Sequence, residues 1–285
     1  MRMKTLIMLG ILLAAAVVAG CAGSEGEEKK ISAPAGMNGA KPPNAQAARS
    51  PGTSASAEAI RRAAAGNRHL FVLFFSKDDE PTRLARKTVE QTVHGIGRSA
   101  EWMAVDIADT SEAEIVNKYN IRSAALPIVL AFAPNGAITG GFLTADITEE
   151  KMKGAIASRG MQECLKALQE RKIVFICSQG KKTQFNKEAM QGVDAFKADA
   201  RYAAYTTIVE IDPADKAETG FLTQLKIDPN AKDAATAILV PPNMVLGVTN
   251  GPTTKESILK MLAASASGGC GPKGCGPTGC GPVKK

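Results

Sequence analysis

The chain has 285 residues, of which 22% are charged and 5% are aromatic, and its formal net charge is +7. This length suits two domains of roughly 100 residues each once the terminal segments are set aside. The basic residues are spread through the chain and do not alternate with aromatic residues. The composition therefore argues against binding to nucleic acid.

The first residues carry the most specific short signal. Arg2 and Lys4 precede an apolar run that ends in the sequence VAGC, with the cysteine at position 21. The run is shorter than the roughly 20 residues that a membrane-spanning helix needs. A basic start, a short apolar core and a small residue before a single cysteine resemble a bacterial lipoprotein signal peptide. The resemblance implies removal of residues 1–20 and acylation of Cys21, with palmitate among the acyl chains.

This resemblance predicts a protein of the bacterial cell envelope that a lipid anchor holds to a bilayer. Ala22, rather than an aspartate, follows the cysteine, which favours the outer membrane, facing the periplasm, over the inner membrane. Residues 21–57 contain no apolar run after the cysteine and are rich in Gly, Ser, Ala and Pro, a composition that predicts a disordered tether. The alternative is an ordinary secretory signal with a chance cysteine.

Residues 58–158 alternate between strand and helix patterns. The continuous apolar run at 70–75 is typical of a buried strand. Ser111 and Glu114 have the spacing of a capping box. The other predicted elements are helices near 57–65, 81–93 and 112–119, strands at 102–107, 128–132 and 137–143, and a last helix that begins at Thr148 and carries Met152 and Ile156.

This order, β-α-β-α-β-β-α, resembles the thioredoxin fold. The sequence SKDDEPT at 76–82 stands where thioredoxins carry Cys-Gly-Pro-Cys, and aligning the prolines puts Asp79 and Thr82 at the two cysteine positions. Pro127 matches the cis-proline of the family. Thiol–disulfide exchange needs two thiols, so the resemblance implies the fold and a peptide-docking groove without catalytic residues.

Residues 159–264 repeat the plan in a more divergent form. The predicted strands are 173–177, 206–211, 237–240 and 244–248, and the predicted helices are 161–170, 184–199, 214–225 and a last one behind a capping box at Thr253 and Glu256. The loop at 178–183 has no cysteine. The fold class that we predict is therefore α/β, with two thioredoxin-like domains in tandem.

Two cysteines lie inside the second predicted domain. Cys164 is on a predicted helix, and Cys177 is at the end of the next strand. They could form a disulfide if the helix packs over the strand end, since the bond requires Cα atoms within about 7 Å. The alternative is two buried free thiols.

The tail at 265–285 contains three copies of Cys-Gly-Pro at a five-residue period, which place cysteines at 270, 275 and 280. Gly and Pro would let this flexible chain curl, so that Cys270, Cys275 and Cys280 could converge on one centre. Soft thiolates favour Cu(I) or Zn. Thiol–disulfide chemistry in the tail and a tail without chemistry are the alternatives.

Together these patterns predict a lipid-anchored binding or scaffolding protein with an envelope protein as partner. Its tail thiolates would present a soft-metal site. One alternative is a thiol–disulfide oxidoreductase that uses the tail cysteines. Another is a lipoprotein that only docks a protein partner.

Overall fold

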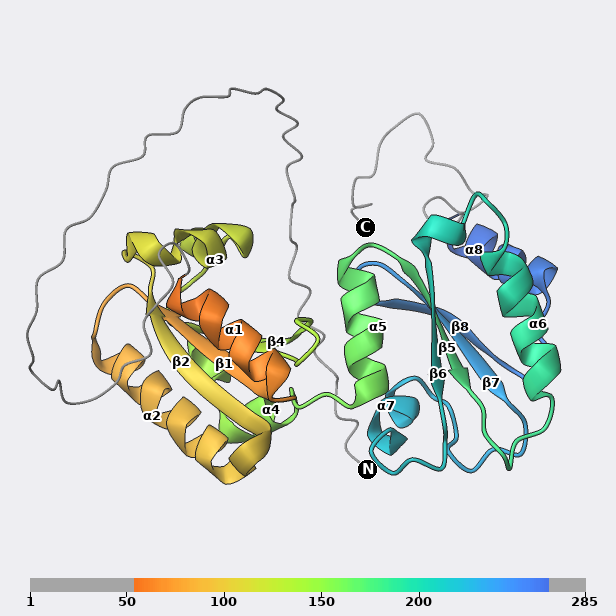
Figure 1. Cartoon of the computed structure of the whole chain (residues 1–285), viewed down its shortest axis with the longest axis horizontal. Helices are drawn as coiled ribbons and strands as arrows, with labels where there is room; N and C mark the ends of the chain where they lie inside the picture. Colours follow the sequence, from red (N-terminus) through yellow and green to blue (C-terminus); the bar gives the residue numbers. More distant parts are fainter. Residues whose placement is uncertain (1–53, 267–285) are drawn as a thin grey trace, which may run out of the picture.

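The computed structural model describes residues 54–266. This part is mixed α/β and contains two four-stranded sheets with equivalent strand orders (Figure 1). The first sheet has the order β2-β1-β3-β4, with strands β1 His69–Phe75, β2 Ala100–Asp106, β3 Ile128–Phe132 and β4 Ile138–Leu143. The second has the order β6-β5-β7-β8, with strands β5 Ile173–Ser178, β6 Thr206–Ile211, β7 Ala235–Val240 and β8 Met244–Asn250.

Strand directions are the same in both sheets. In the first sheet β1 is parallel to β2 and antiparallel to β3, and β3 is antiparallel to β4. In the second sheet β5 takes the place of β1, with β6 parallel to it and β7 antiparallel to it, and β8 is antiparallel to β7. A parallel start and a hairpin finish are the arrangement that the thioredoxin resemblance implied.

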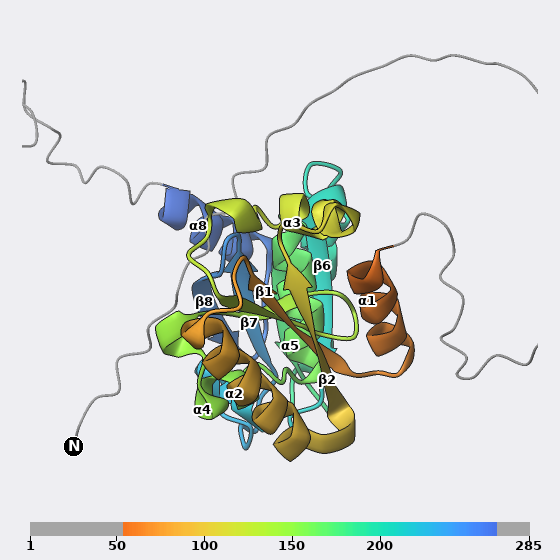
Figure 2. The ribbon, with the colours of Figure 1, turned by 90° about the vertical axis from the view of Figure 1, so that its left-hand side faces the viewer.

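Helices cover both faces of each sheet. The helices are α1 Ala55–Ala65, α2 Glu80–Ile96, α3 Ala113–Lys118, α4 Glu149–Lys153, α5 Arg159–Gln169, α6 Asn186–Lys197, α7 Thr219–Gln224 and α8 Lys255–Ala266. On the first sheet α1 and α3 cover one face, and α2 and α4 cover the other. Figure 2 shows α1 and α2 on opposite sides of β1 and β2. On the second sheet α5 and α7 lie opposite α6 and α8.

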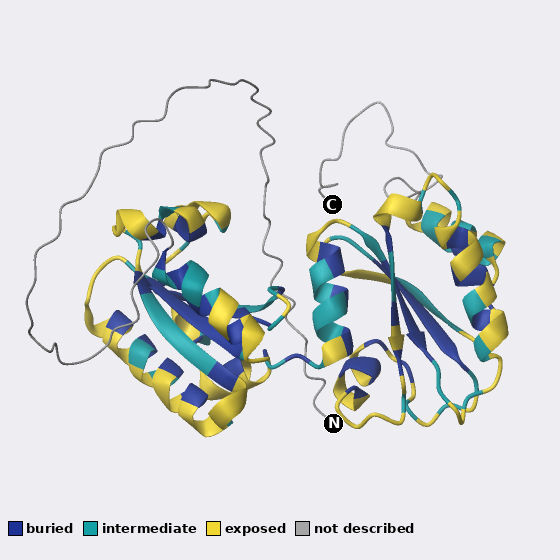
Figure 3. Ribbon diagram, in the orientation of Figure 1, coloured by how far each residue is buried: buried dark blue, intermediate teal, exposed yellow. Residues whose placement is uncertain are grey.

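The two layers explain why the central strands are apolar without interruption. Alternate residues of β1 enter different cores: Val72 and Phe74 lie with α1 and α3, whereas Phe71 and Leu73 lie with α2. All four side chains are fully buried. Figure 3 shows the same burial along the central strands of both sheets. Since each strand buries both faces, the continuous run correctly predicted a central strand.

A buried carboxylate binds the first helix of each unit. Glu112, just before α3, accepts hydrogen bonds from the backbone N–H and the hydroxyl of Ser56 in α1. Glu218, just before α7, accepts from Gly160 N (2.8 Å) and from Ser158 Oγ (2.6 Å) at the start of α5. Both glutamates are about 95% buried. Each therefore joins the segment after the second strand to a helix N-terminus, where a negative charge is favoured.

Hydrogen bonds join the first sheet to the connecting segment and to α5 of the second unit. The Nε2 atom of His69 in β1 accepts a bond of 3.1 Å from the N–H of Ala157, in the segment that leads into α5. Burial lowers the pKa of His69, and so favours the neutral ring that this bond requires. The side-chain amide of Gln169 in α5 binds both the N–H (3.0 Å) and the C=O (2.7 Å) of Ile138 in β4.

Three local predictions were wrong. The capping box at Ser111 and Glu114 does not form, because Asp109 accepts from Ser111 N in a 3-10 turn that precedes α3. The last cap lies one residue later than expected, with Thr254 and Ser257 bonded reciprocally. Helix α4 stops at Lys153, so Ile156 is not part of it.

We expect Glu218→Ala to destabilise the second unit by about 1–3 kcal/mol, because the buried N–H of Gly160 would lose its acceptor. Glu218→Gln keeps one acceptor oxygen and should lose less. The measurement is equilibrium unfolding in urea, with Glu210→Gln, an exposed carboxylate on β6, as the control. Equal midpoints for Glu218→Ala and the native chain would contradict the structural role of this carboxylate.

Candidate functional site

The loop between β1 and α2 is the position of the redox pair in thioredoxins. In this chain Asp79 is the N-cap of α2, and its carboxylate accepts a hydrogen bond of 3.1 Å from the backbone N–H of Thr82. Pro81 occupies the first turn, where the missing N–H costs nothing. The bond from the Thr82 N–H, which is the largest cause, lowers the pKa of Asp79. The first cysteine position thus holds an ionised helix cap.

The side chains at the two cysteine positions have different surroundings. Asp79 is exposed, whereas Thr82 is only 2% exposed. Two positions further along α2, the side chain of Leu84 points into solvent and is 65% exposed. The end of the loop and the start of α2 therefore carry an exposed carboxylate and an exposed apolar side chain, and they contain no thiol.

Pro127 adjoins this loop. The Leu126–Pro127 peptide bond is cis, and β3 begins at the next residue, Ile128. Because Ile128 is the register partner of Phe74 in β1, the proline lies beside the end of β1 where the loop begins. Asp79, Leu84 and Pro127 thus come from elements that meet at one end of the sheet.

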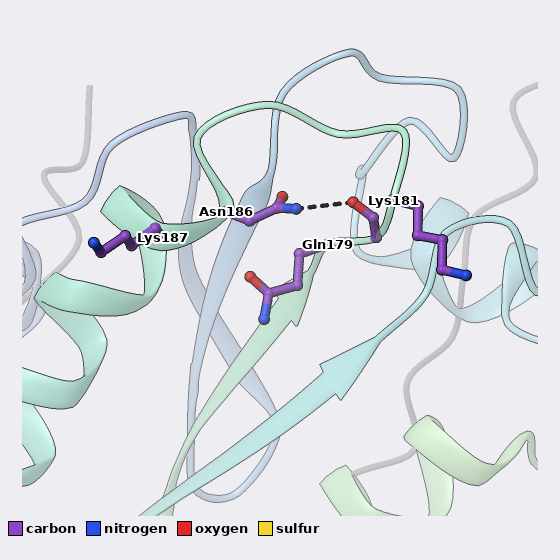
Figure 4. A pocket seen from close by; sticks show the side chains of 5 residues that line it. Gln179, Lys181, Asn186 and Lys187 are labelled. Carbon is purple, nitrogen blue, oxygen red and sulfur yellow. Dashed lines mark hydrogen bonds between the residues drawn. The ribbon is translucent and has the colours of Figure 1, made fainter.

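The equivalent loop of the second sheet forms a shallow hollow of about 500 Å³, lined by Gln179, Gly180, Lys181, Asn186 and Lys187 (Figure 4). The amide of Asn186 donates to the C=O of Gly180 (2.8 Å), which holds the loop against the start of α6. A Cβ on Gly180 would lie 2.7 Å from the carboxylate of Asp212, so any other residue here would require that side chain to move. Figure 4 shows the two lysine side chains pointing away from each other, and they do not form a convergent anion site.

The second unit has no proline at the position equivalent to Pro127. Ala234 precedes β7 at the place that Pro127 has before β3, since Ala235 is the register partner of Ser178 at the end of β5. The other cis bond of residues 54–266 is Pro241–Pro242, in the turn between β7 and β8. It lies at the opposite end of β7, away from the hollow.

The suggested Cys164–Cys177 disulfide is not formed, and both residues are free, buried thiols. Cys164 packs in the core under α5 and α7, whereas Cys177 packs in the core under α6. The sheet separates the two sulfur atoms because Cys177 points to the face opposite α5. Burial, the largest cause for both, raises each pKa to about 12.

The predicted acylation site Cys21 and the proposed metal ligands Cys270, Cys275 and Cys280 lie outside the described residues. Within residues 54–266, no three His, Cys, Asp or Glu side chains are grouped so that they could hold a metal ion. In the same part of the chain, no helix has the length and apolarity needed to span a membrane.

Comparison with known proteins supplies structural neighbours only. No family model matches the chain, and no curated protein matches it. Among solved structures, Fasciola hepatica thioredoxin is 22% identical over 35% of this chain and 90% of its own, with a TM-score of 0.29. Thioredoxin O2 from Arabidopsis thaliana, in the oxidised state, is 17% identical over 36% of this chain and 86% of its own, with a TM-score of 0.30.

Such low identities and TM-scores carry no functional argument. The thioredoxin-like fold of this chain rests instead on the strand order, the strand directions and the placement of Pro127 described above. Because Asp79 and Thr82 stand at the two cysteine positions, this loop has no thiol and differs from the redox site of that fold.

We predict that Cys164 and Cys177 resist thiol reagents in the native chain. With a pKa of about 12, only about 10⁻⁴ of each thiol is ionised at pH 8. In a variant with Cys270, Cys275 and Cys280 replaced by Ser, a disulfide reagent should label both sites only after unfolding in guanidinium. Rapid labelling of the native variant would contradict the burial of these thiols.

Proposed function

We propose that this chain is a membrane-anchored binding protein of the bacterial cell envelope, in which a thioredoxin-like fold serves docking without thiol–disulfide exchange. One observation carries the docking role. At the redox position Asp79 caps α2, Leu84 is exposed in α2, and a buried cis proline stands at the adjoining strand end. The site thus keeps an accessible surface and lacks the nucleophile that exchange requires.

The second unit supports the same conclusion. Its sheet order, its buried Glu218 and its loop after the first strand repeat the plan of the first unit. We interpret it as a divergent copy, because Ala234 replaces the proline and Gln179 to Lys182 contain no cysteine. Neither described cysteine is accessible.

The signal sequence and the tail complete the proposal. The VAGC sequence supports an acyl anchor on Cys21, with an outer-membrane location facing the periplasm. The repeat of Cys-Gly-Pro supports a soft-metal site for Cu(I) or Zn on Cys270, Cys275 and Cys280. The competing function is a thiol–disulfide oxidoreductase that works through these tail cysteines.

Docking is tested by placing a photo-cross-linking amino acid at Leu84 in the lipidated chain in cells. We expect cross-links at Leu84 to one envelope protein, because this apolar side chain is 65% exposed in the second turn of α2. Tyr205 is 63% exposed and distant in sequence from that loop, and it supplies the matched control position. Equal yields of the same product at Leu84 and Tyr205 would count against a docking surface at the β1–α2 loop.

The tail is tested by measuring bound metal and free thiols together on residues 22–285 purified without oxygen. A soft-metal site predicts about one Cu or Zn per chain with three protected thiols, both lost when the tail cysteines become Ser. An oxidoreductase predicts no metal, a reducible tail disulfide and exchange turnover. Five free thiols without metal would leave the docking role alone.

A further inference from the structure

The connection between the two units includes one buried histidine, His69. It opens β1, is 5% exposed, and shares the strand face of Phe71 and Leu73, toward α2. Its Nε2 atom lies 3.1 Å from the backbone nitrogen of Ala157, in the segment at 154–158 that joins α4 to α5. A backbone N–H can only donate, so this contact requires an Nε2 atom without a proton.

Ala157 is bonded to both units at once. Its N–H donates to His69, and its C=O accepts from the side-chain amide of Gln162 in α5 (2.9 Å). The next residue, Ser158, caps α5 and donates to the buried carboxylate of Glu218. The bond at His69 therefore holds the start of the second unit against the first sheet.

The hydrogen bonds of His69 and of Gln169 respond differently to acid. Gln169 binds the N–H and the C=O of Ile138 through a neutral amide, which does not titrate. His69 carries an imidazole, and the ordinary pKa of that group is about 6.5. A second ring proton would place two N–H donors against each other and leave the buried N–H of Ala157 without an acceptor.

Among residues 54–266, His69 has no carboxylate partner that would stabilise a charged ring. Burial, the largest cause, lowers its pKa, and a hydrogen bond to the backbone of Ser99 acts in the opposite direction. The charged groups of the neighbouring elements are bonded to other partners or exposed. They are Arg62, Arg68 and Glu101 beside β1 and β2, Glu90, His94 and Arg98 along and after α2, Glu149, Glu150, Lys151 and Lys153 on α4, and Arg159, Glu163 and Glu218 on α5 and before α7.

We propose that protonation of His69 releases the N–H of Ala157, so that the segment at 154–158 is bound to the first sheet at neutral pH and is freed in mild acid. The contact of Gln169, at the opposite end of α5, still joins the units after this release. The start of α5 can then move relative to β1 while its end stays attached to β4. This pH-sensitive contact goes beyond the proposed docking function and does not depend on it.

The direction of the effect follows from burial. Because the folded chain binds the proton less readily than a freed imidazole does, the contact is at full strength above about pH 6.5 and weakens as the pH falls below that value.

The test is hydrogen exchange at the Ala157 amide of residues 22–285 under reducing conditions, measured by NMR at pH 7.5 and pH 5.5. The protection factor should fall by up to about tenfold, since a freed imidazole goes from roughly one tenth to roughly nine tenths protonated over this interval. His69→Gln offers an acceptor oxygen that does not titrate, so it should remove the pH dependence. His94→Gln is the matched control, because His94 is the other histidine of the chain and is exposed in the last turn of α2, and it should keep the full loss.

The ring nitrogens of His69 supply a second readout on the native chain, which stands even if His69→Gln folds poorly. Their NMR shifts at pH 7.5 should show a proton on Nδ1 and none on Nε2, and acidification should protonate Nε2 together with the loss of Ala157 protection. A neutral ring with its proton on Nε2 would overturn the proposal. Protection of Ala157 that is equal at both pH values, or that falls as much in His69→Gln as in the native chain, would also overturn it. A His94→Gln variant without the pH dependence would do the same.

Discussion

One buried carboxylate in each unit of this protein holds the first helix against the rest of the fold. Glu112 and Glu218 accept hydrogen bonds from the first turn of α1 and of α5, and so attach that helix to the segment after the second strand of the sheet. Burying a carboxylate is costly unless hydrogen bonds compensate it, and the orphan N–H groups of a helix N-terminus are suitable donors. Because this contact also fixes where α5 begins, it sets the position from which Gln169 reaches β4.

The parts that could be predicted from the sequence depend on patterns within one segment. The run at 70–75 identified a central strand, since a strand buried on both faces must be apolar at every position. The burial of Glu112 and Glu218 was missed because their partners lie 56 and 58 residues away. The order of the strands resembled thioredoxin closely enough to place Asp79 and Pro127 at one end of the sheet. Spacing along the chain could not show that Cys164 and Cys177 occupy opposite faces.

The loops after β1 and β5 occupy equivalent places in the two units but carry different side chains. In the first unit a carboxylate caps α2, and the adjoining peptide bond at Pro127 is cis. In the second unit Phe185 precedes α6 with a φ of +60°, no side chain caps the helix, and the loop forms a shallow hollow. Both strand ends thus differ from the thiol pair that the fold uses for exchange, although the strands that position them have the same order and directions.

One edge of the first sheet takes part in the contact between the two units. β4 would be exposed in an isolated first unit, but Gln169 of α5 satisfies its backbone at Ile138 and makes that edge part of the contact between units. The corresponding strand of the second sheet, β8, has no following unit to supply an equivalent side chain among residues 54–266. A chain that repeats one plan twice thus protects the first hairpin edge internally.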